Sequence, residues 1–248
     1  AVAGAALLLA LWHLASLRSP PLPTPADTFS RLREMLADPF YDRGPNDKGI
    51  GRQLLISLRR VGTGFAAATA VGVPLGLAIG ASRRAFSAVN PIVSVLRPVS
   101  PLAWFPIWLT VTRDADQASV FVIFITALWP TVINTAAAAG DIPIEQQNVA
   151  RVFRFGRLAY LRHVLIPNSL GGMVTGMRLS MGIAWMVIVA VEMLSGGTGI
   201  GFFVWDAYNA GSLEAVTAAI IIIGGVGVAL DVGFQRLGRR VSISEVRS

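Results

Sequence analysis

Cysteine is absent from the sequence, and histidine and lysine are nearly so: the 248 residues include two histidines and a single lysine, Lys48. The absence of cysteine excludes disulfides, thiolate metal sites and thiol nucleophiles. His13 and His163 are far apart in the chain and have no carboxylate at a metal-ligand spacing, so we expect no metal site. No combination of nucleophile, base and orienting acid can be assembled either. The sequence therefore predicts neither an enzyme nor a cofactor site in this chain.

Charged residues are also scarce. They make up 14% of the chain, whereas hydrophobic residues make up 54% and the mean hydropathy is +0.62. Soluble domains have about 25% charged residues, so this composition predicts an integral membrane protein. The net charge of +7 does not indicate nucleic-acid binding, because the basic residues lie at the ends of apolar blocks, where arginine anchors membrane helices.

The apolar residues form blocks of about the ~20 residues that a membrane-spanning helix requires. The predicted spans are 1–17, 54–80, 88–111, 118–138, 168–194 and 214–235. We expect the first to be the remainder of a longer helix. The sequence thus predicts an all-α bundle of about six transmembrane helices, with residues 1–248 as a single domain.

A different pattern follows the first span. Thr24 begins a helix-capping sequence, and Phe29, Leu32 and Leu36 then fall on one face of a helix. We expect residues 25–37 to form a helix that lies at the membrane interface.

Small residues recur every fourth position in two spans, which predicts close helix packing. They are Gly64, Ala68, Gly72, Gly76 and Gly80 in the second span, and Gly172, Gly176, Ser180 and Ala184 in the fifth. The third span contains Pro91, Pro98, Pro101 and Pro106. We expect the prolines to break that helix, which must then be buried in protein or line a cavity, because lipid cannot satisfy its freed carbonyls.

Arginines between the spans indicate the orientation. Those at 83–84, 151–162 and 236–247 fall on one side, which the positive-inside rule makes cytoplasmic. The segment 18–60 opposes this assignment, because it carries eight basic residues and would lie outside.

Residues 141–167 form the one long amphipathic stretch between spans. Val149, Val152 and Phe153 face one way and are flanked by arginines, and we expect a second short helix that Pro167 closes. A helix of this kind is too short to span a membrane. It either docks onto a partner or rests on lipid headgroups.

The stretch resembles the "EAA" loop in the permease subunits of bacterial ABC importers, whose pattern is Glu-Ala-Ala, three residues, Gly, nine residues and Ile-x-Leu-Pro. Here the pattern falls on Asn148-Val149-Ala150, Arg154 and Val164-Leu165-Ile166-Pro167. The spacing holds, although the Glu, the first Ala and the Gly are replaced.

Longer segments are similar to the nitrate/nitrite, cyanate and bicarbonate branch of these permeases. They are ARVFRFGRLAYLRHVLIP, residues 175–209 and DPFYDRGPNDKGIG. The resemblance implies a type I ABC importer fold in the bacterial inner membrane. It also implies a second permease copy, two cytoplasmic subunits that bind ATP and Mg, and an extracytoplasmic substrate-binding protein. The residues expected to couple to the ATPase are Val149, Arg151, Val152, Phe153, Arg154, Phe155 and Gly156.

Two arginines lie within predicted spans, where charge is costly and marks functional candidates. Arg97 and Arg178 are each about nine or ten residues from the cytoplasmic end, roughly 14 Å deep at 1.5 Å per residue. We expect them to form a positive collar in the substrate pathway. The alternative is a structural ion pair with Asp231.

Ser195-Gly-Gly-Thr-Gly-Ile-Gly201 is not a phosphate-binding loop, because no lysine follows at the required spacing and no strand precedes it. We expect a flexible re-entrant turn on the external side.

Besides an ATP-driven importer for a small inorganic oxyanion, with nitrate as the first candidate, two other functions stay open. They are an ion-coupled secondary anion transporter, and an ABC permease for sulfonates such as taurine.

Overall fold

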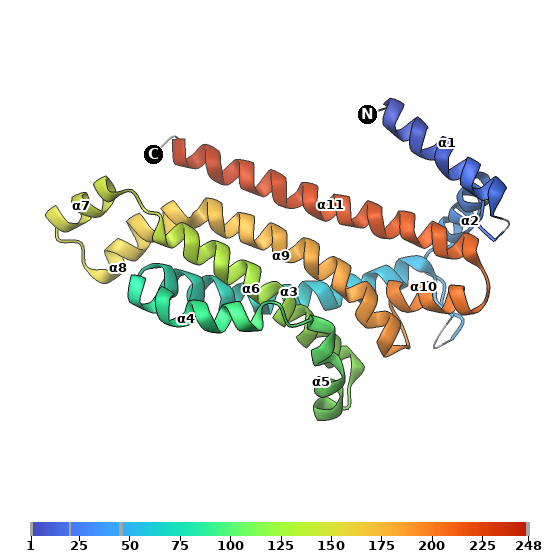
Figure 1. The fold of residues 1–248 in the computed structure, drawn as a ribbon, viewed down its shortest axis with the longest axis horizontal. Coiled ribbons are helices and arrows are strands. Elements are labelled where there is room, and N and C mark those ends of the chain that lie inside the picture. The colour runs from blue at the N-terminus through green and yellow to red at the C-terminus, as the bar shows by residue number, and fades with distance from the viewer. Residues whose placement is uncertain (1, 20, 45–46, 247–248) are drawn as a thin grey trace. The chain divides into compact units, whose positions relative to one another are not determined.

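A computed structural model of the chain describes residues 2–19, 21–44 and 47–246. Within these residues the fold is helical, apart from one isolated β-bridge between Asp42 and Lys48. The helices in chain order (Figure 1) are α1 (Val2–Arg18), α2 (Pro25–Ala37), α3 (Ile50–Gly80), α4 (Arg83–Leu96), η1 (Pro101–Ala103), α5 (Trp104–Thr112), α6 (Ala115–Gly140), α7 (Ile144–Val152), α8 (Arg157–Tyr160), η2 (Leu161–Leu165), α9 (Ile166–Ser195), α10 (Ile200–Asn209) and α11 (Leu213–Val246).

The chain divides into two compact units. Unit 1 comprises Ala1–Arg59 and Val189–Gly227, and unit 2 comprises Arg60–Ile188 and Val228–Ser248. Helices α3, α9 and α11 each contribute residues to both units.

Four helical stretches in the described residues are long and apolar enough to cross a membrane: Ile50–Gly80, Ala115–Gly140, Arg157–Ser195 and Leu213–Arg239. They confirm the second, fourth, fifth and sixth predicted spans. A fifth candidate is a bent pair, Arg84–Leu96 with Pro101–Thr112. The first predicted span corresponds only to a shorter apolar helix, Ala6–Arg18.

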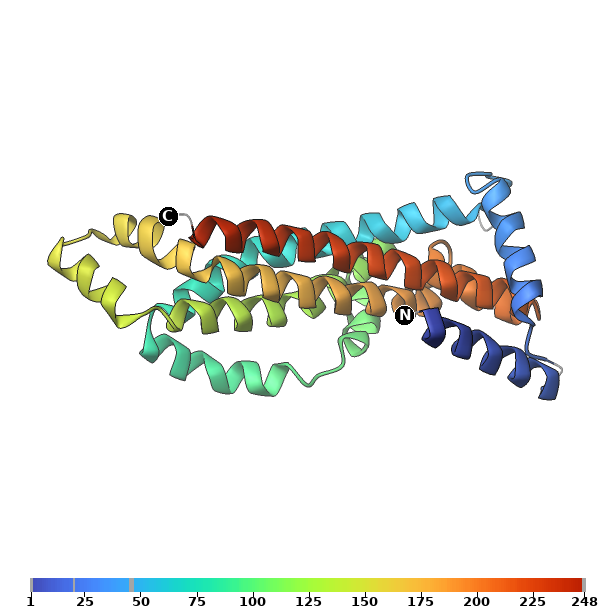
Figure 2. The same cartoon turned by 90° about the horizontal axis from the view of Figure 1, so that it is seen from above.

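The third predicted span is broken, but not at every proline as we expected. Pro91 lies inside α4, whereas Pro98 lies in the break that follows Leu96, and the two halves are bent by 75° (Figure 2). Pro98 and Pro101 have no N–H group to continue the helical ladder, so the break falls where two of the four prolines come closest together.

Helix α6 packs between the small-residue faces of α3 and α9. A Cβ atom added to Gly76 would lie 2.6 Å from Cβ of Thr135, and one added to Gly172 would lie 2.3 Å from Cβ of Ala138. Both distances are shorter than real Cβ contacts, so the backbones approach as closely as glycine allows. The close packing predicted from the four-residue repeat is confirmed.

Hydroxyl groups add polar contacts between α6 and α9. The hydroxyl oxygens of Thr131 and Ser180 lie 2.7 Å apart, and Ser180 lies 2.7 Å from the carbonyl oxygen of Ala127. All three residues are buried. Such interhelical bonds stabilise packing where lipid offers no alternative partner.

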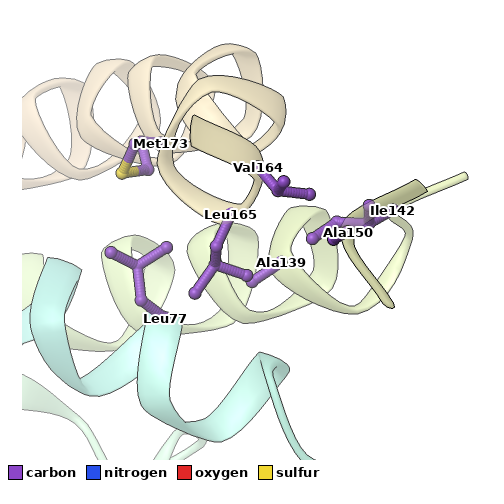
Figure 3. Packing of buried hydrophobic residues seen from close by; sticks show 7 residues of the cluster. All are labelled: Leu77, Ala139, Ile142, Ala150, Val164, Leu165 and Met173. Carbon is purple, nitrogen blue, oxygen red and sulfur yellow. The ribbon is translucent and has the colours of Figure 1, made fainter. Parts of the chain in front are cut away.

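A hydrophobic cluster fixes the segment after α6 to the long helices (Figure 3). Ile142 and Ala150 pack with Val164 and Leu165 of η2, in the same cluster as Leu77, Ala139 and Met173 of α3, α6 and α9. Pro167 does not end a helix as we expected. It is the second residue of α9, inside the continuous helical stretch Arg157–Ser195 and directly after the π-helical turn of η2.

Candidate functional site

The segment 141–167 holds a short helix with one buried and one exposed face. Ala150 is only 4% exposed, whereas Val152 is 78% and Phe153 71% exposed. Val149 and Phe155 are also exposed. Burial on one side fixes the position of α7, and the other side presents an apolar surface of the kind that marks an interaction site.

Helix α7 ends in a Schellman turn at Arg154. Arg154 has a φ of 51°, its N–H group donates to the carbonyl of Arg151, and the N–H of Phe155 donates to the carbonyl of Ala150. The left-handed conformation favours glycine, which is the residue that the EAA pattern has at this position. The geometry therefore gives a physical reason for that glycine, which arginine replaces in this chain.

Arg97 lies at the C-terminal end of α4, next to the proline break. It lines a cavity of about 260 Å³ that is otherwise largely apolar, with Ser94 as a second polar residue. A cation is favourable at a helix C-terminus, where carbonyl groups lack partners. Arg97 therefore brings a positive charge to the edge of this cavity, at a helix end that favours a cation.

A larger cavity of about 720 Å³ shares two lining residues, Phe86 and Ala136, with the cavity of Arg97. Its polar lining includes Gln147 and Arg151 of α7. Two groups of residues singled out in the sequence, Arg97 and those of helix α7, therefore line neighbouring cavities.

Arg178 makes the ion pair that the sequence left open as an alternative. Its Nε and Nη2 atoms donate to the two carboxylate oxygens of Asp231 at 2.6 and 2.9 Å, and Gln235 donates to the same carboxylate. This bidentate geometry is the strongest that arginine and carboxylate form.

One group of residues was missed from the sequence. Glu192 is completely buried near the end of α9, 2.8 Å from the hydroxyl of Ser57, and it accepts a hydrogen bond from the N–H of Gly201. The loop between α9 and α10 ends in the first turn of α10, which is held by buried side chains, and the flexible re-entrant turn on the external side stays a prediction. The available signal was a carboxylate at the end of an apolar span.

Two aspartates outside the spans have lowered pKa values. A hydrogen bond from the backbone N–H of Gln117, with others from the start of α6, lowers the pKa of Asp114, which caps that helix. A hydrogen bond from Lys48 lowers the pKa of Asp42 in the loop before α3. Arg52 also donates to Asp42, so this loop is closed by charged contacts.

The apolar helices, the proline-broken pair and the exposed helix between spans together define a helical membrane protein that crosses the membrane several times. The chain belongs to the family of binding-protein-dependent transport system inner membrane components, whose model matches residues 72–243. It is accordingly a multi-pass protein of the inner membrane.

Several characterised permeases are similar over most of their length. The nitrate import permease protein NrtB of Synechocystis is 44% identical over 91% of this chain and 82% of that protein. The bicarbonate transport system permease protein CmpB of Synechococcus elongatus is 42% identical, over 93% and 84%. The taurine transport system permease protein TauC of Escherichia coli is 28% identical, over 96% and 86%.

The fold is also that of a solved transporter. A chain of the inward-facing MetNI methionine ABC transporter superimposes with a TM-score of 0.69, over 77% of this chain and 95% of that chain. The sequence identity is 16%, so the likeness concerns the fold alone. It confirms the predicted type I ABC importer architecture.

Proposed function

We propose that this chain is the permease subunit of an ATP-driven importer for a small inorganic oxyanion, with nitrate as the first candidate. The observation that carries the proposal is its 42–45% identity to three nitrate permeases over more than nine-tenths of the chain. Bicarbonate permeases are nearly as similar, so bicarbonate, nitrite and cyanate belong in the same test. A sulfonate is a weaker candidate, because the taurine permease is only 28% identical.

The proposed assembly contains two copies of this chain, each acting as a single permease domain. Two cytoplasmic subunits bind ATP and Mg and hydrolyse the nucleotide, and an extracytoplasmic binding protein delivers the anion. Helix α2 lies along the membrane interface. The permease itself forms the path and carries no cofactor.

In the proposed pathway, Arg97 attracts the anion into its cavity. A guanidinium group offers planar, paired donors that match an oxyanion. The neighbouring cavity then leads past Arg151 toward the cytoplasm. Arg178 is the second arginine of the proposed pathway, and its ion pair with Asp231 holds its guanidinium group in place.

The exposed residues of the segment 141–167 are the proposed contact with the ATP-binding subunit. On α7 and its C-cap residue, the most exposed apolar side chains are those of Val152 and Phe153. Arg151 and Arg154 flank them in the sequence. An apolar centre with a charged rim is typical of a docking helix.

The substrate is tested with the complete transporter in proteoliposomes. ATP hydrolysis is measured with the matching binding protein and each anion in turn: nitrate, nitrite, bicarbonate, cyanate and taurine. The proposal requires that an inorganic oxyanion stimulates hydrolysis. Stimulation by taurine alone, or by no anion, would refute it.

Docking is tested by Phe153→Asp, with Phe40→Asp as a matched control because Phe40 is also an exposed aromatic residue, in the loop after α2. We expect Phe153→Asp to lose co-purification of the ATP-binding subunit, while the control retains it. Retention by both variants would remove α7 from the interface.

The pathway is tested by Arg97→Ala, with Arg113→Ala as the control arginine, which lies after α5 and is exposed. We expect uptake to be lost in Arg97→Ala while basal ATP hydrolysis and assembly remain. Normal uptake in this variant would exclude Arg97 from the path.

A further inference from the structure

The first turn of α10 is held by three side chains from two other helices. The N–H of Gly199 donates to Oε1 of Gln53 at 2.6 Å, and the N–H of Ile200 donates to Oγ of Ser57 at 2.9 Å. The N–H of Gly201 donates to Oε2 of Glu192 at 3.0 Å. The first N–H groups of a helix have no partner within it, and here side chains of α3 and α9 accept from those of Gly199, Ile200 and Gly201.

Glu192 joins these acceptors into one cluster. The hydroxyl of Ser57 lies 2.8 Å from both carboxylate oxygens, and Glu192, Ser57 and Gln53 are each 1% exposed or less. A buried carboxylate is costly unless hydrogen-bonded, and the positive end of a helix favours it. The cluster is therefore a buried polar contact that joins α3, α9 and α10.

Glycine is required at two positions in this contact. Gly199 has a φ of +128°, and a Cβ atom there would lie 2.2 Å from Cδ of Glu192. A Cβ atom on Gly201 would lie 2.1 Å from the carbonyl oxygen of Val189. The glycine-rich loop thus serves to bring the start of α10 directly against α9.

We infer that Glu192, with Ser57 and Gln53, is a positioning residue that makes α10 move together with α9 during transport. The inference rests on the proposed function. Helix α9 begins directly after the segment that contains the coupling residues, so α10 and the coupling segment are attached to opposite ends of one helix. The covalent connection between α9 and α10 is a loop containing three glycines with positive φ, so the hydrogen bonds of the cluster add a fixed contact to a loop of unusual backbone conformation.

Mobility of α10 gives a direct test that does not depend on transport. The chain has no cysteine, so Asn209→Cys at the end of α10 provides one labelling site for a nitroxide. We expect an immobile label in the wild type and in Ser195→Ala, a control whose hydroxyl donates to the backbone carbonyls of Glu192 and Gly196 and not to the Glu192 carboxylate. We expect a mobile label in Glu192→Ala, and an intermediate one in Glu192→Gln, which keeps one carbonyl oxygen.

The functional readout is ATP hydrolysis by the complete transporter. We expect Glu192→Ala to keep basal hydrolysis but to lose about tenfold or more of the stimulation by the loaded binding protein, the factor expected from losing one charged hydrogen bond. Glu192→Gln should recover part of it. If Glu192→Ala does not assemble, Ser57→Ala replaces it, since it removes both the contact with Glu192 and the acceptor for Ile200.

An immobile label in the variants, or unchanged stimulation, would overturn the inference. Failure of the proposed function is separable, because the wild type would then show no stimulation by any of the anions, whereas the label would still report on the cluster.

Discussion

Adjacent glycines in α9 are expected to respond in opposite ways to the same substitution. A Cβ atom on Gly172 would lie 2.3 Å from Cβ of Ala138, whereas a Cβ atom on Gly171 would have no atom within 4 Å. Alanine is a better helix former than glycine at both positions. Gly171→Ala should therefore be neutral or stabilising, and Gly172→Ala should destabilise the packing of α9 on α6.

The size of the effect follows from the missing space. An ordinary contact needs at least 3.4 Å, so the helices must separate by about 1 Å at Gly172. Overpacking of this kind costs about 1–3 kcal/mol. The gain in helix propensity is common to both variants, so the difference between them measures the packing cost itself. For a chain of this size that difference is roughly 2–4 °C in Tm for each kcal/mol.

The assay is thermal unfolding of the two purified variants in the same detergent, monitored by the loss of monodisperse protein. We expect Gly172→Ala to have the lower Tm by several degrees. If Gly172→Ala is as stable as Gly171→Ala, the close approach of α9 and α6 is refuted, and with it the interpretation of the four-residue repeat.

Other substitutions test further features of the fold. Thr24→Ala removes the acceptor of the capping box of α2 and should cost about 1 kcal/mol, seen as faster hydrogen exchange of the first amides of that helix. Arg154→Gly relieves a left-handed arginine and should stabilise the turn after α7 by about 1 kcal/mol, in contrast to Arg154→Glu, which keeps the strain and should weaken ATPase docking. Because the pKa of Asp114 is lowered, its contribution to stability is complete above the ordinary aspartate pKa and is lost as pH falls through the lowered value. Tm should therefore fall more steeply on acidification in the wild type than in Asp114→Asn. Arg178→Asp and Asp231→Arg should each reduce expression, because each leaves two like charges facing each other. The double variant exchanges the charges and should restore expression. If it does not, the pair has no structural role.

Features that depend on residues close together in the chain could be predicted from the sequence. The spacing of Gly72 and Gly76 specifies a helix face whatever packs on it, and α6 packs there. The capping residues before α2 lie within four positions of each other, and this helix begins and ends where the pattern predicts. Its position at the membrane interface stays a prediction.

The cluster around Glu192 could not be predicted in the same way. Ser57 and Glu192 are 135 residues apart, and Gln53 and Gly199 are 146 apart, so no local spacing connects them. The glycine-rich loop was interpreted alone, as a turn, without the buried carboxylate that it packs against. The same limit applied to Arg178 and Asp231, which are 53 residues apart, so the sequence allowed their ion pair but could not specify it.

The π-helical turn at Leu161–Leu165 shifts the phase of the helix in which it lies. The N–H of Ile166 donates to Leu161, five residues back, so this turn holds one residue more than an α-helical turn. A helical wheel drawn through residues 157–195 is consequently out of phase by about 100° on one side of the turn. Removing one residue there would rotate the exposed face of α7 and α8 relative to α9 without changing any side chain on it. The direction in which Phe153 points is thus set by the number of residues before α9 as well as by their types.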